Sequence, residues 1–277
     1  MIIKNCEINL YDTITCGQAF RWFLESDDSF TIILKDRVVN LKQINKDIHI
    51  KSSNMEDIIN IVSYYLDLIT DYNEINRVLL NNDSNLEKYI NSTFGFKILN
   101  QDPLEMIVSY IISQNNHLRN IMKSVNLLSE RYGKQIIFEN KKYYLFPTLN
   151  ELSLLSIENF RNIGVGFRDK YLVEVIKNIK NNDLELNYDN ELNGEASMKY
   201  LCLNKGIGPK VASCILLFSY NKYDVFPIDT WIKKFFLNNY PNVKNTEKEI
   251  SKYSKEKYGK YSGIVLQYFF HYERNKN

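Results

Sequence analysis

The spacing of apolar and polar positions changes near residue 55. Before that point, short runs of β-branched and aromatic residues alternate with polar turns, as at Phe20–Leu24, Phe30–Leu34 and Val38–Lys42. Runs of this composition at short spacing predict an antiparallel sheet. From Met55 onward, apolar residues recur at helical spacing, beginning at Ile58, which predicts helices joined by short polar loops.

This change of pattern predicts an α+β fold. Residues 1–55 form a small N-terminal antiparallel β-sheet domain in this prediction, with some helix up to about residue 100. Residues 56–277 form a larger all-helical domain. A chain of 277 residues is long enough for two such domains.

Capping residues place the starts of two helices. Asp102 stands before Pro103, and Glu105 follows three residues after Asp102, which is typical of a helix N-terminus. This helix should end near Gln114. A second helix should begin at Pro209, because proline suits the first helical position, where its missing N–H would be unpaired anyway.

The residues around Pro209 suggest a phosphate-binding site with a nucleophilic lysine. Gly206 and Gly208 allow the backbone to turn tightly and to approach a partner closely. The helix start offers free N–H groups and a partial positive charge, so it suits a phosphate. Lys210 lies in the first turn, where an ammonium is disfavoured, and this favours the neutral, nucleophilic amine. An ordinary turn, or a lysine that only contacts a phosphate, is also compatible with this segment alone.

Asp229 follows Lys210 by nineteen residues. An apolar helix and a polar turn separate the two, so the chain can return and bring the carboxylate near the amine. The simpler interpretation of Asp229 is an N-cap of the helix that starts at Thr230. Both roles are compatible, because a cap position fixes the carboxylate rigidly.

Composition narrows the function classes. Hydrophobic residues make up 44% and charged residues 25% of the chain, as in ordinary soluble proteins. The formal net charge is only +2, so a DNA-binding surface would have to be a local basic patch. No apolar run is long enough for a membrane span. The four cysteines form no C-x-x-C pair, which argues against a zinc ribbon or an iron–sulfur cluster. Scattered cysteines in a chain of this size fit a reducing cytoplasm, and we expect no metal site and no membrane binding.

Four segments carry motifs with a recognisable order. They are Cys16-Gly17-Gln18-Ala19-Phe20-Arg21-Trp22, Ser113-Gln114-Asn115-Asn116, Gly164-Val165-Gly166-Phe167-Arg168, and Gly206-Ile207-Gly208-Pro209-Lys210 with the later Pro227-Ile228-Asp229. Together they resemble the 8-oxoguanine DNA glycosylase/AP lyase family of the helix-hairpin-helix superfamily. The resemblance covers nearly the whole chain and implies a helix-hairpin-helix motif at about 195–220.

The resemblance implies a bifunctional enzyme that excises 8-oxoguanine from duplex DNA and cleaves the strand by β-elimination, in base excision repair. With it we expect a cytoplasmic monomer that acts on nucleoid DNA and needs no cofactor. Lys210 would attack C1′ and form a Schiff base, and Asp229 would stabilise positive charge on the sugar or help to activate the amine. The implied base pocket consists of Gly17, Cys214, Pro227, Leu266 and Phe270. Within it, the Gly17 carbonyl would accept a hydrogen bond from N7–H, which guanine lacks.

The resemblance also implies the DNA contacts. Asn115 would fill the space left by the extruded base, Phe167 would wedge beside the opposite base, and Arg168 would reach that base. Backbone amides at Gly206, Gly208 and Val211 would hold a phosphate, with Trp231 nearby on the DNA.

Three positions depart from the family pattern. Leu266 stands where the family has a glutamine that contacts the pairing edge of the base, although Gln267 is adjacent. Trp231 stands where many relatives have a phosphate-contacting histidine. Asn120 stands where some relatives have an arginine that reads cytosine, so we expect weaker preference for cytosine opposite the lesion.

Two other functions remain open at this point. A related glycosylase for other damaged purines, such as alkylated ones, generally uses water and lacks the hairpin lysine. A non-catalytic DNA-binding module would use the hairpin only for its grip on phosphate.

Overall fold

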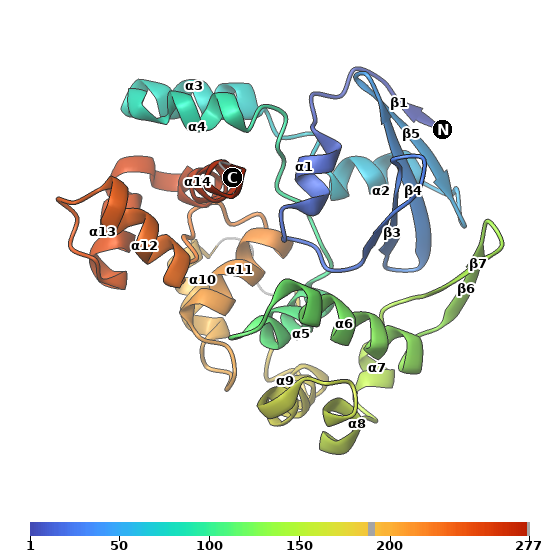
Figure 1. Cartoon of the computed structure of the whole chain (residues 1–277). Helices are drawn as coiled ribbons and strands as arrows, with labels where there is room; N and C mark the ends of the chain where they lie inside the picture. Colours follow the sequence, from blue (N-terminus) through green and yellow to red (C-terminus); the bar gives the residue numbers. More distant parts are fainter. Residues whose placement is uncertain (188–191, 276–277) are drawn as a thin grey trace.

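The computed structural model describes residues 1–187 and 192–275. A five-stranded antiparallel sheet near the N-terminus adjoins a larger, mostly helical region (Figure 1). The sheet order is β1-β5-β4-β3-β2. The predicted α+β fold class is therefore confirmed.

The strands of this sheet lie close to the predicted runs. Their bounds are β1 (Ile2–Ile3), β2 (Trp22–Leu24), β3 (Phe30–Leu34), β4 (Arg37–Ile44) and β5 (Asp47–Ser52). The run from Phe20 pairs only from Trp22 onward. Phe20 instead turns inward onto Tyr110, with ring centroids 5.4 Å apart, and Arg21 turns toward Glu105. Two residues of an apparently continuous strand thus fasten the sheet to the helical region.

Helices make up most of the rest of the chain. Their bounds are α1 (Leu10–Thr15), α2 (Ile58–Tyr65), α3 (Tyr72–Asn82), α4 (Glu87–Ser92), α5 (Pro103–Ser113), α6 (Leu118–Tyr132), α7 (Leu149–Leu152), α8 (Ile157–Arg161), α9 (Asp169–Lys180), α10 (Gly194–Leu201), α11 (Pro209–Ser219), α12 (Thr230–Asn239), α13 (Glu247–Tyr258) and α14 (Ser262–Arg274). Short 3₁₀ turns occupy Ser84–Leu86, Gly166–Arg168 and Gly259–Tyr261. Within the described ranges, none of the helices combines the length and apolar character needed to cross a membrane.

A short hairpin in the helical region, β6 (Gln135–Phe138) with β7 (Lys141–Tyr144), has no counterpart in the sequence prediction. Its turn residues Glu139 and Asn140 both have positive φ, as a type I′ turn requires. The hairpin packs back on the N-terminal sheet, where Tyr143 joins Ile33 and Val38 in a small apolar cluster.

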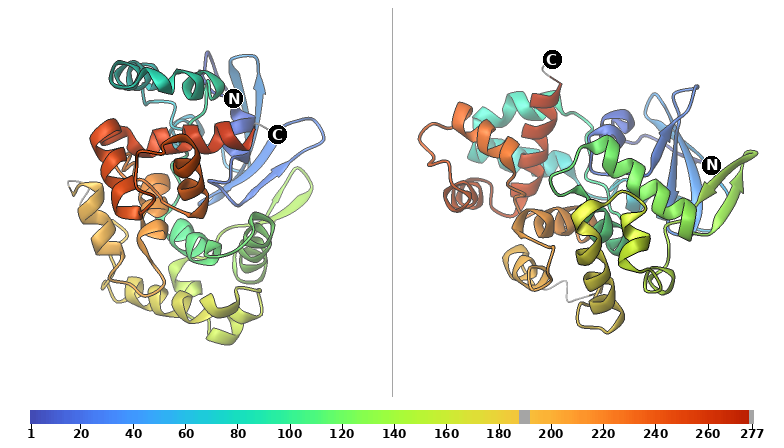
Figure 2. Two further views of the ribbon diagram at one scale, coloured as in Figure 1. Left: turned by 60° about the vertical axis from the view of Figure 1, so that its left-hand side comes forward. Right: turned by 60° about the horizontal axis from the view of Figure 1, so that its bottom comes forward.

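The C-terminal helix α14 lies beside α3 and α4, although these elements are far apart in sequence (Figures 1 and 2). The Tyr268 hydroxyl donates to Asn76 Oδ1 at 2.9 Å, and the Tyr89 and Phe269 rings are 4.7 Å apart. These contacts fix the helix that carries Leu266 and Phe270.

The Gly17 segment is fastened to the stretch of chain that leads into α5. The Gln18 side chain donates to the carbonyls of Thr13 and Lys97, and its Oε1 accepts from the Leu99 backbone at 3.0 Å. Gln101 Nε2 donates to the Gln18 carbonyl at 2.9 Å.

The division of the chain into a β domain over residues 1–55 and a helical domain over residues 56–277 stays a prediction.

Candidate functional site

The hairpin between α10 and α11 presents an open helix start. Gly208 is the N-cap of α11, Pro209 follows at the first helical position, and no side chain caps the helix. An added Cβ on Gly208 would meet no atom within 4 Å. The free N–H groups of this first turn can therefore be reached by a phosphate oxygen.

Gly206 has a different reason to be glycine. Its φ is +86°, in the left-handed region that side chains rarely adopt, and an added Cβ would lie 2.5 Å from Cβ of Tyr171. The Gly206 carbonyl accepts a hydrogen bond from Gln114 Nε2 at 2.9 Å. Gly206 is thus required by the packing of the hairpin, whereas Gly208 leaves space for a ligand.

Lys210, Cys214 and Asp229 lie together. Burial raises the pKa of the Cys214 thiol, the charge of Lys210 and a hydrogen bond from it lower that pKa, and the charge of Asp229 raises it. The Lys210 ammonium also lies 5.5 Å from the centroid of the Tyr110 ring. Lys210 and Asp229 thus both interact with the same thiol, while the direct approach of the Asp229 carboxylate to the Lys210 amine stays a prediction.

Asp229 is the N-cap of α12, and its Oδ1 accepts from the Ile232 backbone N–H at 2.8 Å. This bond fixes the carboxylate on the rigid end of a helix. In the first turn of α12, the Trp231 ring contacts the Phe270 ring edge-on at 5.0 Å. Pro227, two residues before the cap, is buried. Residues assigned to the base pocket and to DNA thus meet at this helix start.

Gly17 has a φ of +97°, and Arg274 Nη1 lies 3.9 Å from the position of an added Cβ. Arg274 Nη1 also donates to the Thr15 carbonyl at 3.0 Å. A cavity of about 620 Å³ adjoins this segment and is lined by Cys16, Arg119 and Arg274, among others. Burial raises the pKa of Cys16 to about 12, so this thiol stays neutral at physiological pH.

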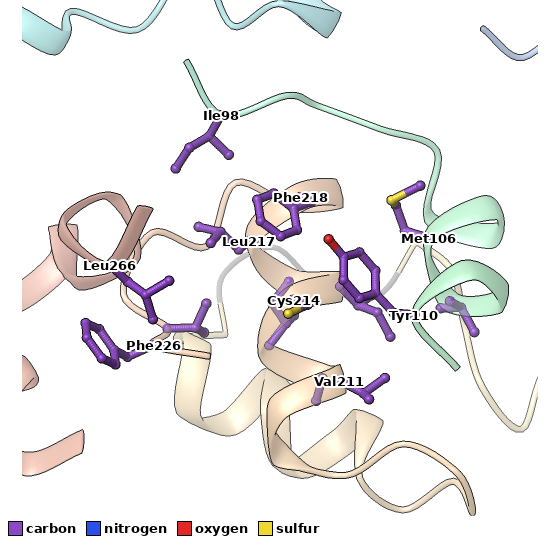
Figure 3. Close-up of a cluster of buried hydrophobic side chains, with 14 of the residues drawn as sticks. Ile98, Met106, Tyr110, Val211, Cys214, Leu217, Phe218, Phe226 and Leu266 are labelled. Atoms are coloured by element: carbon purple, nitrogen blue, oxygen red, sulfur yellow. The ribbon is translucent and has the colours of Figure 1, made fainter. Parts of the chain in front are cut away.

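Tyr110 joins the two halves of the site and was missed by the sequence analysis. Its ring stacks on Phe218 at 5.7 Å and faces Cys214, as Figure 3 shows. Its hydroxyl lies 3.5 Å from the Gln18 carbonyl. The sequence held one signal, because Tyr110 precedes Gln114 by four positions and so shares its helical face.

Leu266 is buried, with 4% of its surface exposed. It lies next to Phe226 on the side of Cys214 away from Tyr110 (Figure 3). An apolar side chain here offers no hydrogen bond to a base. The base contact assigned to this position stays a prediction.

The segments assigned to the DNA strands differ in exposure. Asn115 is exposed and has a φ of +46°, and Phe167 is 59% exposed. Both can reach a partner. Arg168 is only 6% exposed, and its guanidinium is bonded to backbone carbonyls of its own chain. The structure therefore does not place Arg168 beside Phe167 as a second projecting side chain.

The described residues contain no group of three or more His, Cys, Asp and Glu side chains that could hold a metal ion. Surface lysines near the hairpin are partly paired with carboxylates. Lys205 lies 3.7 Å from Glu174, and Lys233 lies 2.7 Å from Glu247. Such exposed pairs are weak and can be exchanged for phosphate contacts.

Comparison with known proteins shows which family this chain belongs to. Residues 1–107 match the family described as 8-oxoguanine DNA glycosylase, N-terminal domain. An 8-oxoguanine glycosylase/lyase from Clostridium acetobutylicum, solved with double-stranded DNA containing cytosine opposite 8-oxoguanine, is 39% identical. The alignment covers 100% of this chain and 95% of that one, with a TM-score of 0.93.

Two further comparisons are more distant. An N-glycosylase/DNA lyase from Arabidopsis thaliana is 26% identical over 97% of this chain and 78% of its own length. A 3-methyladenine DNA glycosylase from Archaeoglobus fulgidus is 22% identical over 99% of this chain and 98% of its own, with a TM-score of 0.80. At that identity the second likeness concerns the fold alone.

Proposed function

The chain belongs to the 8-oxoguanine DNA glycosylase/lyase family, and from this premise we propose that it excises 8-oxoguanine from duplex DNA and cleaves the strand at the resulting abasic site. Lys210 is the nucleophile in this proposal. The observation that supports this proposal is that Lys210, in the open first turn of α11, and Asp229, at the start of α12, both interact with the Cys214 thiol.

The reaction begins when the hairpin holds the strand. Phosphate oxygens accept from the free N–H groups of the first turn of α11, near Gly208 and Val211. The damaged nucleotide leaves the stack, Asn115 takes its place, and Phe167 wedges beside the opposite base. The extruded base then lies between Cys214 and Phe270.

The amine of Lys210 attacks C1′ of the sugar. The bond from C1′ to the base breaks, and the base leaves with the electron pair and takes up a proton. Opening of the sugar ring gives a Schiff base between Lys210 and C1′. The Schiff base acidifies the 2′ proton, whose loss expels the 3′ phosphate and cuts the strand.

Asp229 and Gly17 have separate tasks in this scheme. The Asp229 carboxylate stabilises the positive charge that develops on the sugar as the base leaves. The Gly17 carbonyl accepts from N7–H of 8-oxoguanine. Guanine has no hydrogen there, so the carbonyl would be buried without a partner, at a cost of roughly 1–3 kcal/mol.

Lys210 distinguishes this function from its rivals. A water-using glycosylase for alkylated purines has no need of an amine beside Asp229. A DNA-binding module needs the open helix start but has no need of the buried thiol and carboxylate. We also propose that the protein acts as a cytoplasmic monomer on nucleoid DNA.

A duplex with one 8-oxoguanine tests the proposal. Single-turnover reactions are run on a gel with and without hot alkali, because alkali cuts every abasic site and so reports base release alone. The wild type should give cut strands without alkali. Lys210→Gln should give neither product, although it still binds. Base release without any strand cleavage by the wild type would point to a water-using glycosylase, and binding without either product to a module.

A further inference from the structure

The C-terminal end of α14 reaches α1, the short helix that leads into Gly17 (Figures 1 and 2). Arg274, the last residue of α14, donates from Nη1 to the carbonyl of Thr15, the last residue of α1, at 3.0 Å. One turn earlier on α14, His271 Nε2 lies 3.3 Å from Oδ2 of Asp12, in the first turn of α1. Two side chains of α14 thus hold the helix that precedes Gly17.

The Thr15 carbonyl needs a donor from outside its own helix. The last four carbonyls of a helix have no partner within that helix, and a cation close to them is favourable. The last turn of α1 contains no basic residue. Arg274, which follows Thr15 by 259 positions in the sequence, supplies this cation.

The backbone that Arg274 holds leads directly to Gly17. Cys16 is the C-cap of α1, and Gly17 follows it with a φ of +97°, which turns the chain out of the helix. Arg274 Nη1 lies 3.9 Å from the position of an added Cβ on Gly17. Two side chains donate to the next carbonyl, that of Gln18. Within the described residues no group donates to the Gly17 carbonyl, so this carbonyl is available to a ligand.

The same helix α14 carries another residue of the base pocket. Phe270 stands four positions before Arg274 and therefore on the same side of α14, and its ring contacts the Trp231 ring of α12 at 5.0 Å. The bond from Arg274 to Thr15 thus ties the Gly17 turn to the helix that presents Phe270. Lys210 lies on α11 and takes no part in these contacts.

We propose that Arg274 is a positioning residue for base recognition: by capping α1 it holds the Gly17 carbonyl where N7–H of 8-oxoguanine has to donate. This inference rests on the proposed function. Arg274 acts through Gly17 and touches neither the base nor a phosphate. Loss of Arg274 therefore impairs recognition of the damaged base and leaves the chemistry of Lys210 unchanged.

Two substrates separate recognition from chemistry. Single-turnover rates are measured on a duplex with 8-oxoguanine, where hot alkali reports base release, and on a duplex with a preformed abasic site, which has no base to recognise. Arg274→Gln should release 8-oxoguanine roughly tenfold more slowly, because an exposed charged hydrogen bond is lost. It should cleave the abasic site within about twofold of the wild-type rate.

The ratio of the two rates does not depend on the fraction of folded variant. Equal losses on both substrates, or an unchanged ratio in Arg274→Gln, would overturn the role of Arg274. A wild type that cleaves neither substrate would instead refute the proposed function itself.

Arg119→Gln is the matched control. Arg119 lines the same cavity as Arg274 and loses the same charge, but within the described part of the chain it makes no hydrogen bond or ion pair. The ratio of the two rates should stay within about twofold of the wild-type ratio. An equal fall of this ratio in Arg119→Gln and Arg274→Gln would show that charge at the cavity is responsible, and would contradict the proposal.

Binding tests whether Arg274 acts through Gly17. Affinities for duplexes with 8-oxoguanine and with guanine are compared in a Lys210→Gln background, so that the DNA is not consumed. Gly17→Ala should lower this discrimination, because alanine rarely adopts a φ of +97°. Addition of Arg274→Gln to Gly17→Ala should lower it by less than about a further twofold, since both changes act on one carbonyl.

Two results of the binding experiment would overturn the proposal. A clear further loss of discrimination in the double variant would show that Arg274 contacts the base itself. An equal loss of affinity for both duplexes in Arg274→Gln alone would show that Arg274 holds a phosphate.

Discussion

Alanine at Gly206 should mainly lower stability, whereas alanine at Gly208 should mainly weaken DNA binding. At Gly206 an alanine would have to adopt a φ of +86°, with its Cβ 2.5 Å from Cβ of Tyr171. The left-handed conformation costs about 1–2 kcal/mol, and overpacking of this kind typically adds about 1–3 kcal/mol. We therefore expect Gly206→Ala to lower the free energy of unfolding by about 2–5 kcal/mol.

Gly208 has a φ of −87°, which alanine adopts without strain, and the added methyl group would meet no atom within 4 Å. A weaker N-cap and a less flexible unfolded chain roughly offset each other, so stability should change by less than about 1 kcal/mol. The methyl group would, however, stand where a phosphate approaches. Loss of charge-assisted hydrogen bonds should weaken DNA binding roughly 10- to 100-fold.

Two assays separate these effects. Unfolding in urea gives the change in stability, and fluorescence anisotropy with an 8-oxoguanine duplex gives the affinity. Binding is measured with each alanine placed in a Lys210→Gln background, so that the DNA is not consumed. Wild-type affinity in the Gly208 variant would show that phosphate is not held there. Wild-type stability in the Gly206 variant would show that the contact with Tyr171 is wrong.

Three further predictions concern single carboxylates and selectivity. Asp229→Asn should keep the hydrogen bond to the Ile232 backbone N–H, because asparagine caps a helix as well as aspartate does. The variant should retain DNA binding while its turnover falls roughly a hundredfold. Near-normal turnover would remove Asp229 from the mechanism. With Asn120 in place of an arginine, the preference for cytosine opposite the lesion should be weak when excision rates are compared on the four opposite bases, and strong cytosine selectivity in the same single-turnover assay would contradict this. Burial raises the pKa of Glu105 from 4.5 to about 7, against the opposing charge of Arg21. The unfolded carboxyl ionises first as pH rises between these values, so folding of the wild type becomes less favourable across this window. Relative to Glu105→Gln, the wild type should lose about 2 kcal/mol of stability from pH 5 to pH 8, as measured by urea unfolding, and a constant difference would refute the shifted pKa.

Features set by local chemistry could be predicted from the sequence. The helix starts at Pro103, Pro209 and Thr230 follow from residues within one turn of each start, and all three are confirmed. The hairpin glycines were predicted on the same basis. Capping and turn preferences act over a few residues, so a single sequence displays them.

Features set by contacts between distant segments could not be predicted. The inward orientation of Arg168 depends on carbonyls more than fifty residues away. In the sequence, Tyr110 is one apolar position among several on its helix. Its closeness to both Cys16 and Cys214 depends on the packing of α5 against α11. The β6–β7 hairpin has only four residues a side, and it is supported by the contact of Tyr143 with Ile33 and Val38 of the N-terminal sheet, which lie about a hundred residues away in the sequence.

Chemical capture of the Schiff base tests the central claim most directly. The protein is incubated with an 8-oxoguanine duplex in the presence of borohydride, and the covalent adduct is digested and mapped by mass spectrometry. The wild type should give one adduct, reduced onto Lys210, and Lys210→Gln should give none. An adduct on another lysine, or undiminished trapping in Lys210→Gln, would contradict the assignment of Lys210 as the nucleophile.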